Sequence, residues 1–220
     1  MLTDWIGRLC TRVGGIWSNS LQDSLKYYKE RERLPDVIRV VRRLRAEMPH
    51  DTALVINSLY EEGVALRTLS RLDEAETTFK EALRWAHPHY PDRIDILAQL
   101  SVVLTDRGDL SAADSLQKEA YKLAHALRDS TRLKRLLTVM SYTAYYKDDF
   151  HAMAAYSREL LQITDEKSPH DGVIRYAALT NLGLALSSLG RAAEAENYLR
   201  QAWMGAFIYT IPSQYARSHR

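Results

Sequence analysis

Cysteine, phenylalanine, proline and glycine are scarce in this chain of 220 residues, with one, three, six and nine copies. A single cysteine, Cys10, excludes an internal disulfide and a cysteine-rich metal site, and it fits a reducing compartment. So few glycines and prolines leave little room for long linkers or low-complexity segments. No stretch approaches the roughly 18 to 20 apolar residues of a membrane span, and the N-terminus lacks an apolar signal-peptide core. We therefore expect a cytoplasmic protein without a membrane partner.

Net charge and catalytic motifs are also lacking. The 30 basic and 28 acidic residues leave a formal charge of +2, so bulk electrostatics do not favour nucleic acid as a partner. No glycine-rich phosphate loop, GxSxG or HExxH occurs. His87 and His89 share a loop, but no cysteine or carboxylate stands at ligand spacing beside them. The sequence therefore predicts a protein that is not an enzyme and holds no cofactor and no metal.

Two amphipathic helical patterns separated by a short break fill residues 176–203. Each pattern places apolar or small residues on one helical face: Leu179, Leu182, Gly183 and Leu186 in the first, and Ala192, Ala195, Leu199 and Ala202 in the second. Gly183 and Ala195 are small enough for two antiparallel helices to lie close together. Gly190 lies in the break, where a helix C-terminus needs a residue that tolerates positive φ. The stretch predicts a helix–turn–helix hairpin.

The same hairpin recurs along the chain. The residues equivalent to Gly183 are Leu25, Gly63, Ser101 and Ser141, at intervals of 38, 38, 40 and 42 residues. The second helices repeat as well, with Val37, Ala75, Ala113 and Met153 equivalent to Ala195, and Leu44, Ala82, Ala120 and Leu160 equivalent to Ala202. The turns equivalent to the one at Gly190 fall at 32–34, 70–72, 108–110 and 148–150, and Gly108 begins the third of them. An ordinary helical bundle would not show this long-range self-similarity.

This pattern resembles the tetratricopeptide repeat, which places a large residue before Leu-Gly, an apolar residue, a glycine turn and then Ala, a large apolar residue and Ala. The resemblance implies an all-α fold, a right-handed α-solenoid of about five helix-turn-helix repeats. We expect the array over residues 18–203, with units near 18–49, 56–87, 94–124, 134–164 and 176–203. The period exceeds the 34 residues standard for the family. In unit length the chain is similar to the arrays of kinesin light chain and of bacterial peptide-sensing regulators.

Two segments flank the expected array. Residues 1–17 are predicted to form a short helix that covers the open end of the first repeat, a role that terminal units of solenoids require. The alternative is that this helix anchors a partner or a second copy. Residues 204–220 form a C-terminal extension with apolar residues where a polar end is usual: Phe207, Ile208, Tyr209 and Ile211. The extension either folds back as a cap or contacts a neighbour, which is a second protomer or a further domain.

In solenoids of this family, the first helices of successive units line a concave face that binds other chains. The resemblance therefore implies a non-catalytic module that docks a peptide or protein segment, as an adaptor, a scaffold or the sensor of a regulator. The candidate groove residues are Asn57, Tyr60, Arg67, Arg135, Thr138, Tyr142, Tyr145 and Asn181. Tyrosine rings give contact area at low entropic cost, and asparagine amides pair with peptide backbone. The alternative is that the two asparagines are merely solvated and that the tyrosines pack internally.

Two further functions stay open from the sequence. The apolar C-terminal end would serve self-association into a homo-oligomer. The arginine run of the first unit, comprising Arg39, Arg42, Arg43 and Arg45, would serve contact with nucleic acid phosphates. Second helices mostly face outward in this fold, and nearby glutamates dilute the positive field, so we expect a solvated face there.

Overall fold

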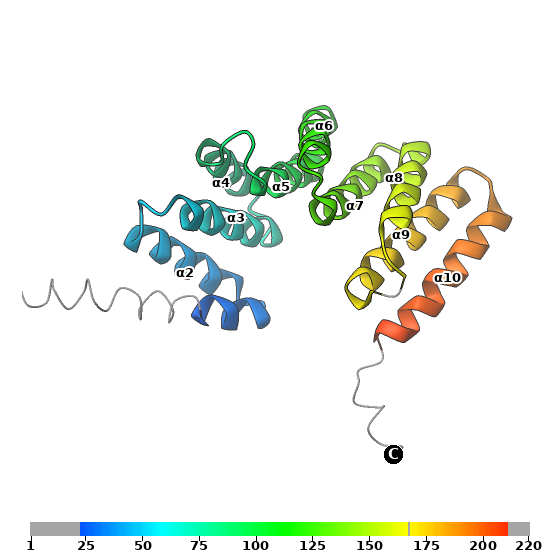
Figure 1. The fold of residues 1–220 in the computed structure, drawn as a ribbon, viewed down its shortest axis with the longest axis horizontal. Coiled ribbons are helices and arrows are strands. Elements are labelled where there is room, and N and C mark those ends of the chain that lie inside the picture. The colour runs from blue at the N-terminus through cyan, green and yellow to red at the C-terminus, as the bar shows by residue number, and fades with distance from the viewer. Residues whose placement is uncertain (1–22, 167, 211–220) are drawn as a thin grey trace, which may run out of the picture. The chain divides into compact units, whose positions relative to one another are not determined.

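The computed structural model describes residues 23–166 and 168–210, which form helices joined by short turns, with no strand among them (Figure 1). A helical segment at residues 23–30 precedes the first labelled helix. The labelled helices are α2 (Leu34–Glu47), α3 (Thr52–Thr68), α4 (Leu72–Trp85), α5 (Asp92–Asp106), α6 (Leu110–Leu127), α7 (Ser130–Tyr146), α8 (Phe150–Ile163), α9 (Pro169–Ser188) and α10 (Ala192–Thr210). The all-α prediction is confirmed.

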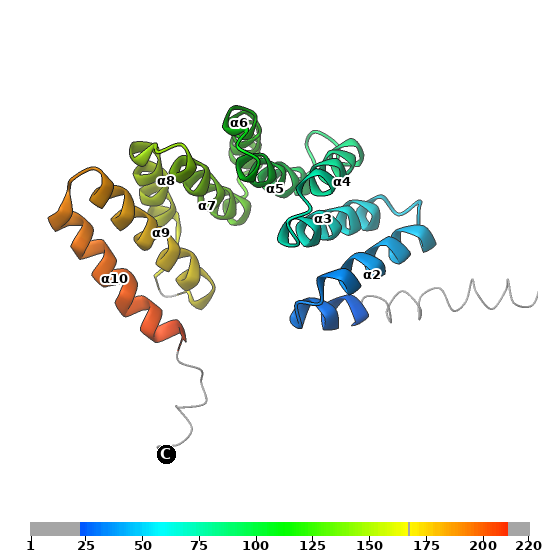
Figure 2. The same cartoon turned by 180° about the vertical axis from the view of Figure 1, so that it is seen from behind.

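The chain divides into two compact units, Met1–Tyr90 and Pro91–Arg220. In the first unit α3 packs against both α2 and α4. In the second unit each helix from α5 to α10 packs against the next one, and α9 and α10 lie side by side (Figure 2). The first helices of successive hairpins also touch, α5 against α7 and α7 against α9. The second unit therefore has a layer of first helices, formed by α5, α7 and α9.

The turns inside the hairpins repeat in geometry as well as in sequence. Each contains one residue of positive φ: Glu32 (53°), Ser70 (58°), Gly108 (84°), Asp148 (54°) and Gly190 (73°). These positions are spaced by 38, 38, 40 and 42 residues, the intervals found in the sequence. At the last turn, the Gly190 amide donates to the Ser187 carbonyl at 3.0 Å and the Arg191 amide to the Leu186 carbonyl at 2.9 Å. Backbone groups at the end of each first helix are satisfied in this way.

Small residues occupy the places where the two helices of a hairpin approach most closely. A Cβ atom on Gly63 would lie 2.6 Å from the ring of Phe79, and one on Gly183 would lie 2.6 Å from Leu199 Cγ. The repeat alanines are buried, with 0% exposure at Ala75, Ala82, Ala113 and Ala120 and 3% at Ala195 and Ala202. Met153 and Leu160, which replace alanine in the fourth hairpin, are buried too. That hairpin therefore accommodates larger side chains at the same positions.

The ends of the chain are described only in part. The predicted helix at residues 1–17 and the residues after 210 lie outside the described part of the chain. The last helix extends to Thr210, past the expected limit of the array at residue 203. Among the helices that the structure describes, none is long and apolar enough to cross a lipid bilayer.

Candidate functional site

The helix at the centre of the first-helix layer, α7, carries a tyrosine cluster formed by Tyr142, Tyr145 and Tyr146. The Tyr142 hydroxyl donates to Asp106 Oδ1 on α5 at 2.7 Å. The Tyr146 ring centroid lies 4.7 Å from that of Tyr142 and 5.7 Å from that of Tyr145, which it meets edge to face. Tyr145 and Tyr146 are each 51% exposed. The cluster thus presents two aromatic rings to solvent and anchors the third to the neighbouring helix.

Only one of the three tyrosines fits the expectation of internal packing. Burial, together with hydrogen bonds to Tyr146 and Asp106, raises the pKa of Tyr142, so its hydroxyl remains protonated at neutral pH. Tyr145, a predicted groove residue, is half exposed and makes its ring contact with another tyrosine. Tyr146 lies beside these two tyrosines in the sequence, and its spacing of four residues from Tyr142 places both on one helical face.

Ion pairs connect the N-terminal part of α7 to α5. Arg132 of α7 pairs with Asp95 of α5 at 2.8 Å and with Asp129 at 2.6 Å, and it also pairs with Asp92. The predicted groove residue Arg135 joins this cluster through a 2.8 Å ion pair with Asp95. These pairs connect α5 to α7, so Arg135 contributes to packing between hairpins as well as to the surface.

The remaining second-unit candidates differ in what their polar groups do. The Thr138 hydroxyl donates to the Lys134 carbonyl at 3.1 Å, so it satisfies its own helix. Asn181 on α9 is partly exposed and makes no hydrogen bond to any described residue. Leu184, one turn further along α9, is 45% exposed. The layer therefore offers an amide and an apolar side chain on α9, the helix that packs against α7.

The three candidates of the first unit lie on α3 in different environments. Asn57 is exposed and lines a cavity of about 430 Å³, together with Leu25, Val41, Leu44 and Leu54. Tyr60 is partly buried, and its ring meets Phe79 edge to face at 6.2 Å. Arg67 is partly buried near the end of the helix. Of these three, Asn57 is the one that the structure marks as exposed, whereas the Tyr60 ring packs against Phe79 in the core.

The arginine run of the first unit is paired throughout with carboxylates. Arg42 and Arg45 bind the two oxygens of Glu62 at 2.6 and 2.8 Å. Arg39 pairs with Asp36 at 2.6 Å, and Arg43 pairs with Glu47 at 2.8 Å. The four guanidinium groups share three carboxylates, since Arg42 and Arg45 bind the same Glu62, so the pairing offsets only part of the positive charge of this run.

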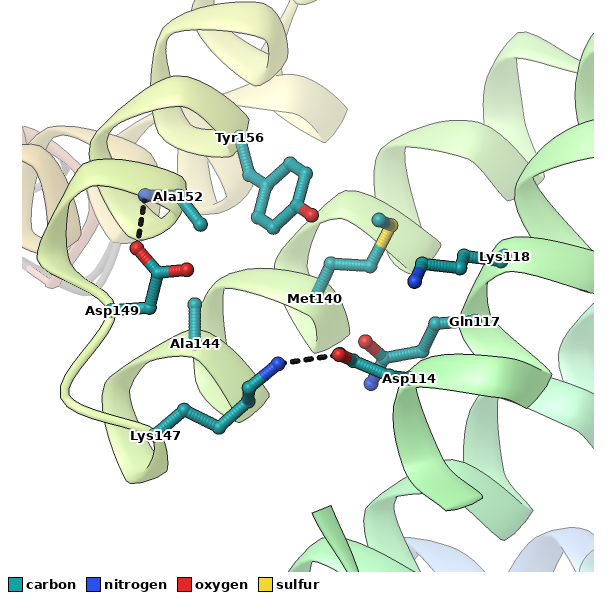
Figure 3. A pocket seen from close by; sticks show the side chains of 9 residues that line it. All are labelled: Asp114, Gln117, Lys118, Met140, Ala144, Lys147, Asp149, Ala152 and Tyr156. Atoms are coloured by element: carbon teal, nitrogen blue, oxygen red, sulfur yellow. Dashed lines mark hydrogen bonds and ion pairs between the residues drawn. The ribbon is translucent and has the colours of Figure 1, made fainter. Parts of the chain in front are cut away.

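A second polar feature of the second unit was not anticipated from the sequence. Gln117 of α6, which is 2% exposed, joins α5 to α7 through its side-chain amide. Its Nε2 atom donates to Ser101 Oγ at 3.1 Å and to Thr143 Oγ1 at 2.6 Å. A cavity of about 190 Å³ opens beside it, between α6, α7 and α8 (Figure 3). A lone glutamine in an amphipathic helix gives no sequence signal for such a role.

Metal binding finds no support among the described residues. Among the side chains that the structure describes, no three or more His, Cys, Asp or Glu residues gather closely enough to hold an ion. The His87 and His89 rings lie 5.8 Å apart in their loop.

Comparison with known proteins agrees with the repeat geometry. Two family models, both described as tetratricopeptide repeat, match residues 177–203 and 56–87. No curated protein matches the sequence. Among solved structures, the chain is similar to BtubC (BKLC) from P. vanneervenii, with a TM-score of 0.76 and 15% identity over 93% of this chain and 87% of that one.

Two other solved structures share the fold. A putative kinesin light chain with nearly identical TPR-like repeats from Podosopora anserina aligns with a TM-score of 0.66 and 14% identity, over 91% of this chain and 97% of that one. The Rap conjugation gene regulator of the plasmid pLS20, in complex with the Phr* peptide, aligns with a TM-score of 0.67 and 15% identity, over 88% of this chain and 54% of that one. The two family matches show tetratricopeptide repeats at residues 56–87 and 177–203, and the fold of the chain is similar to those of the kinesin light chain and Rap structures.

Proposed function

We propose that this chain is a non-catalytic interaction module that binds a peptide or an extended segment of another protein on its first-helix layer. The observation that carries the proposal is the half exposure of Tyr145 and Tyr146 on α7. Tyrosine is enriched at the centres of protein interfaces because its ring buries a large area while its hydroxyl stays paired. The Rap regulator, which shares the fold, holds a peptide in its solved structure, and this supports a peptide as the partner.

The surroundings of the tyrosine cluster suit an extended chain. Tyr142 is held by its bond to Asp106, so the cluster is ordered before a partner arrives, which lowers the entropic cost of binding. Asn181 is available to pair with peptide backbone through both its carbonyl and its amide. Leu184 offers an apolar contact on the same helix. We therefore place the docking surface on α7 and α9.

Replacing Tyr145 and Tyr146 together with alanine is expected to weaken partner binding by tenfold or more, since aromatic anchors typically contribute about 2 kcal/mol each when truncated. The test selects peptides from a random displayed library against the whole chain and then measures their affinities by fluorescence anisotropy. The matched control is Trp85→Ala, which removes an aromatic side chain that is 44% exposed on α4. Equal affinities for the double variant, the control and the unchanged chain would contradict the proposed surface.

Self-association is a second candidate function, favoured by the exposed side of α10. Leu199, Trp203 and Met204 are 36%, 72% and 60% exposed. Leu199 and Trp203 line an open cavity of about 460 Å³. In the other hairpins of this unit the second helix is covered by the next first helix, α6 by α7 and α8 by α9. No further helix follows α10 in the described part of the chain, so a second copy is a suitable occupant.

Trp203→Asp should convert a homo-oligomer into a monomer, because a carboxylate buried in an apolar interface without a partner is strongly unfavourable. Multi-angle light scattering over a range of protein concentrations measures the change. Gln201→Asp on the same helix serves as the charge control, since Gln201 is exposed and lies outside the lining of that cavity. If the unchanged chain is a monomer at every concentration, self-association through α10 is wrong. Phe207 and Ile211, the residues that the sequence suggested for this contact, lie outside the described side chains.

A further inference from the structure

The two exposed tyrosines at the end of α7 have a counterpart in the first hairpin. Tyr27 and Tyr28, near the end of the helical segment at residues 23–30, have ring centroids 5.3 Å apart and an interplanar angle of 81°. Tyr145 and Tyr146 have ring centroids 5.7 Å apart and an interplanar angle of 85°. Each pair lies a few residues before the turn residue of positive φ. The two ring pairs therefore share an edge-to-face geometry beside the same kind of turn.

In the first hairpin, the chain itself places guanidinium groups over this ring pair. Arg31 Cζ lies 3.9 Å from the centroid of the Tyr27 ring, and Arg33 Cζ lies 5.1 Å from that of the Tyr28 ring. A cation over an aromatic face is attracted by the negative potential of the π electrons. These two arginines stand directly before and directly after the positive-φ residue Glu32. The first ring pair is therefore already occupied by cations of its own turn.

The second ring pair is half exposed and has no such cation among the residues that the structure describes. The positions equivalent to the two arginines, before and after the positive-φ residue Asp148, hold Lys147 and Asp149. Figure 3 shows the Lys147 ammonium group directed to Asp114 of α6, with which it forms an ion pair. Asp149 has the opposite charge, and its side chain caps α8. Neither position therefore supplies a cation to the second ring pair.

The charge around the second ring pair is negative. The last residue of α5 and the turns after α5 and α7, residues 106–109 and 147–149, contain four aspartates, one arginine and one lysine. One of these aspartates, Asp106, accepts the Tyr142 hydroxyl at 2.7 Å, so its carboxylate lies against the tyrosine cluster. Neither helix has a basic residue in its last turn, and a helix C-terminus carries partial negative charge. The surroundings therefore favour an added cation over an added anion.

We propose that the tyrosine cluster of α7 binds a lysine or arginine side chain of the partner peptide. This cation takes the place over Tyr145 and Tyr146 that Arg31 and Arg33 occupy in the first hairpin, and Asp106 contributes an opposite charge beside it. The inference rests on the proposed peptide-binding function and adds the charge of the partner to it. An acidic segment is thereby excluded from this part of the surface.

The test uses peptides that are selected from a random displayed library against the whole chain, with affinities measured by fluorescence anisotropy. In the tightest peptide, each arginine is replaced singly by citrulline and each lysine by norleucine, which remove the charge and keep most of the shape. One replacement is expected to weaken binding about tenfold, because it removes a cation from a π face. The residue type that gives the loss identifies the cation as arginine or lysine. If no replacement weakens binding, the proposal is wrong.

A double-mutant cycle then locates the cation on the chain. In the double variant Tyr145→Leu/Tyr146→Leu, which keeps apolar side chains but removes both rings, the loss on neutral replacement should fall from about tenfold to about twofold. The control is Tyr27→Leu, which removes a tyrosine that is 47% exposed in the first unit and should leave the tenfold loss unchanged. Equal losses in the double variant and the control would overturn the proposal, because the cation would then bind elsewhere.

Asp106→Asn tests the contribution of the nearby carboxylate. The amide keeps an oxygen for the Tyr142 hydroxyl and removes the negative charge. The charged peptide is expected to bind about threefold more weakly to this variant, and its neutral form should bind equally to the variant and the unchanged chain. Equal losses for both peptides would show that the charge of Asp106 has no part in recognition.

The outcomes separate this inference from the proposed function. A selection that yields no peptide, or peptides whose affinity does not depend on Tyr145 and Tyr146, contradicts both. Peptides that depend on the two tyrosines but bind equally well after every lysine and arginine is neutralised contradict the cation alone.

Discussion

We expect Glu62→Ala to lower the free energy of unfolding by about 3 kcal/mol, because the substitution breaks an ion-pair network that is largely removed from water. Glu62 is 3% exposed and accepts from both Arg42 and Arg45 through separate oxygens. Removal of the Glu62 carboxylate leaves Arg42 and Arg45 without this partner, and the Arg45 side chain is only 24% exposed. Removing one partner of such a network costs more than the network contributes, since the remaining charges stay poorly solvated.

The neighbouring residue provides the control for Glu62. Glu61 pairs with Lys29, whose side chain is 48% exposed, and exposed ion pairs typically contribute less than about 1 kcal/mol. Urea unfolding followed by far-UV circular dichroism compares Glu61→Ala with Glu62→Ala in the same helix. A similar loss in both variants would mean that burial of the carboxylate is not what makes Glu62 important.

Gly63→Ala is expected to destabilise the first unit by about 2 kcal/mol, although alanine favours helix by roughly 1 kcal/mol over glycine. The added methyl group would lie 2.6 Å from Cε1 of Phe79, whose ring is completely buried and has nowhere to move. The Phe79 ring must then leave its rotamer, or α3 and α4 must move apart. Either change loses packing contacts in a dense core.

The equivalent substitution in the last hairpin separates packing from helix propensity. At Gly183 the added methyl group would meet Leu199, which is 36% exposed and free to swing toward solvent. Gly183→Ala should therefore leave stability nearly unchanged, and Phe79→Leu should reduce the cost of Gly63→Ala in a double-mutant cycle. Urea midpoints measured by circular dichroism for the four variants test this. Equal costs at Gly63 and Gly183 would show that the backbone, and not the Phe79 ring, opposes the substitution.

The hairpins were predictable because their signals are local and repeated. The small residues recur at intervals of 38 to 42, and the structure shows positive φ at the same intervals, from Glu32 to Gly190. A helix period of 3.6 residues and a turn that needs a left-handed residue are properties of short stretches. The hairpin pattern is weak in a single copy, but its five copies at nearly constant intervals make the prediction strong. Even the fourth hairpin, with Met153 and Leu160 at alanine positions, keeps the geometry.

Side-chain partners were less predictable, since they join residues from different helices. Tyr142 binds Asp106 36 residues earlier, and Arg42 binds Glu62 20 residues later. The residues next to Tyr142 and next to Arg42 in the sequence do not indicate these partners. The sequence therefore predicted a solvated arginine face but not the ion pairs with Glu62. It also did not indicate the hydrogen bonds of Gln117.

The amino-acid sequence by itself determined that this chain consists of helical hairpins, where each one turns, and which small residues lie between its helices. These features depend on backbone conformation and on the volume of nearby side chains, so each hairpin encodes them independently. Tertiary structure alone decided which polar groups are buried and paired, which tyrosines are exposed and where a cavity remains. Those outcomes depend on the distances between helices that only packing sets, because a shift of one helical turn would give every side chain a different neighbour.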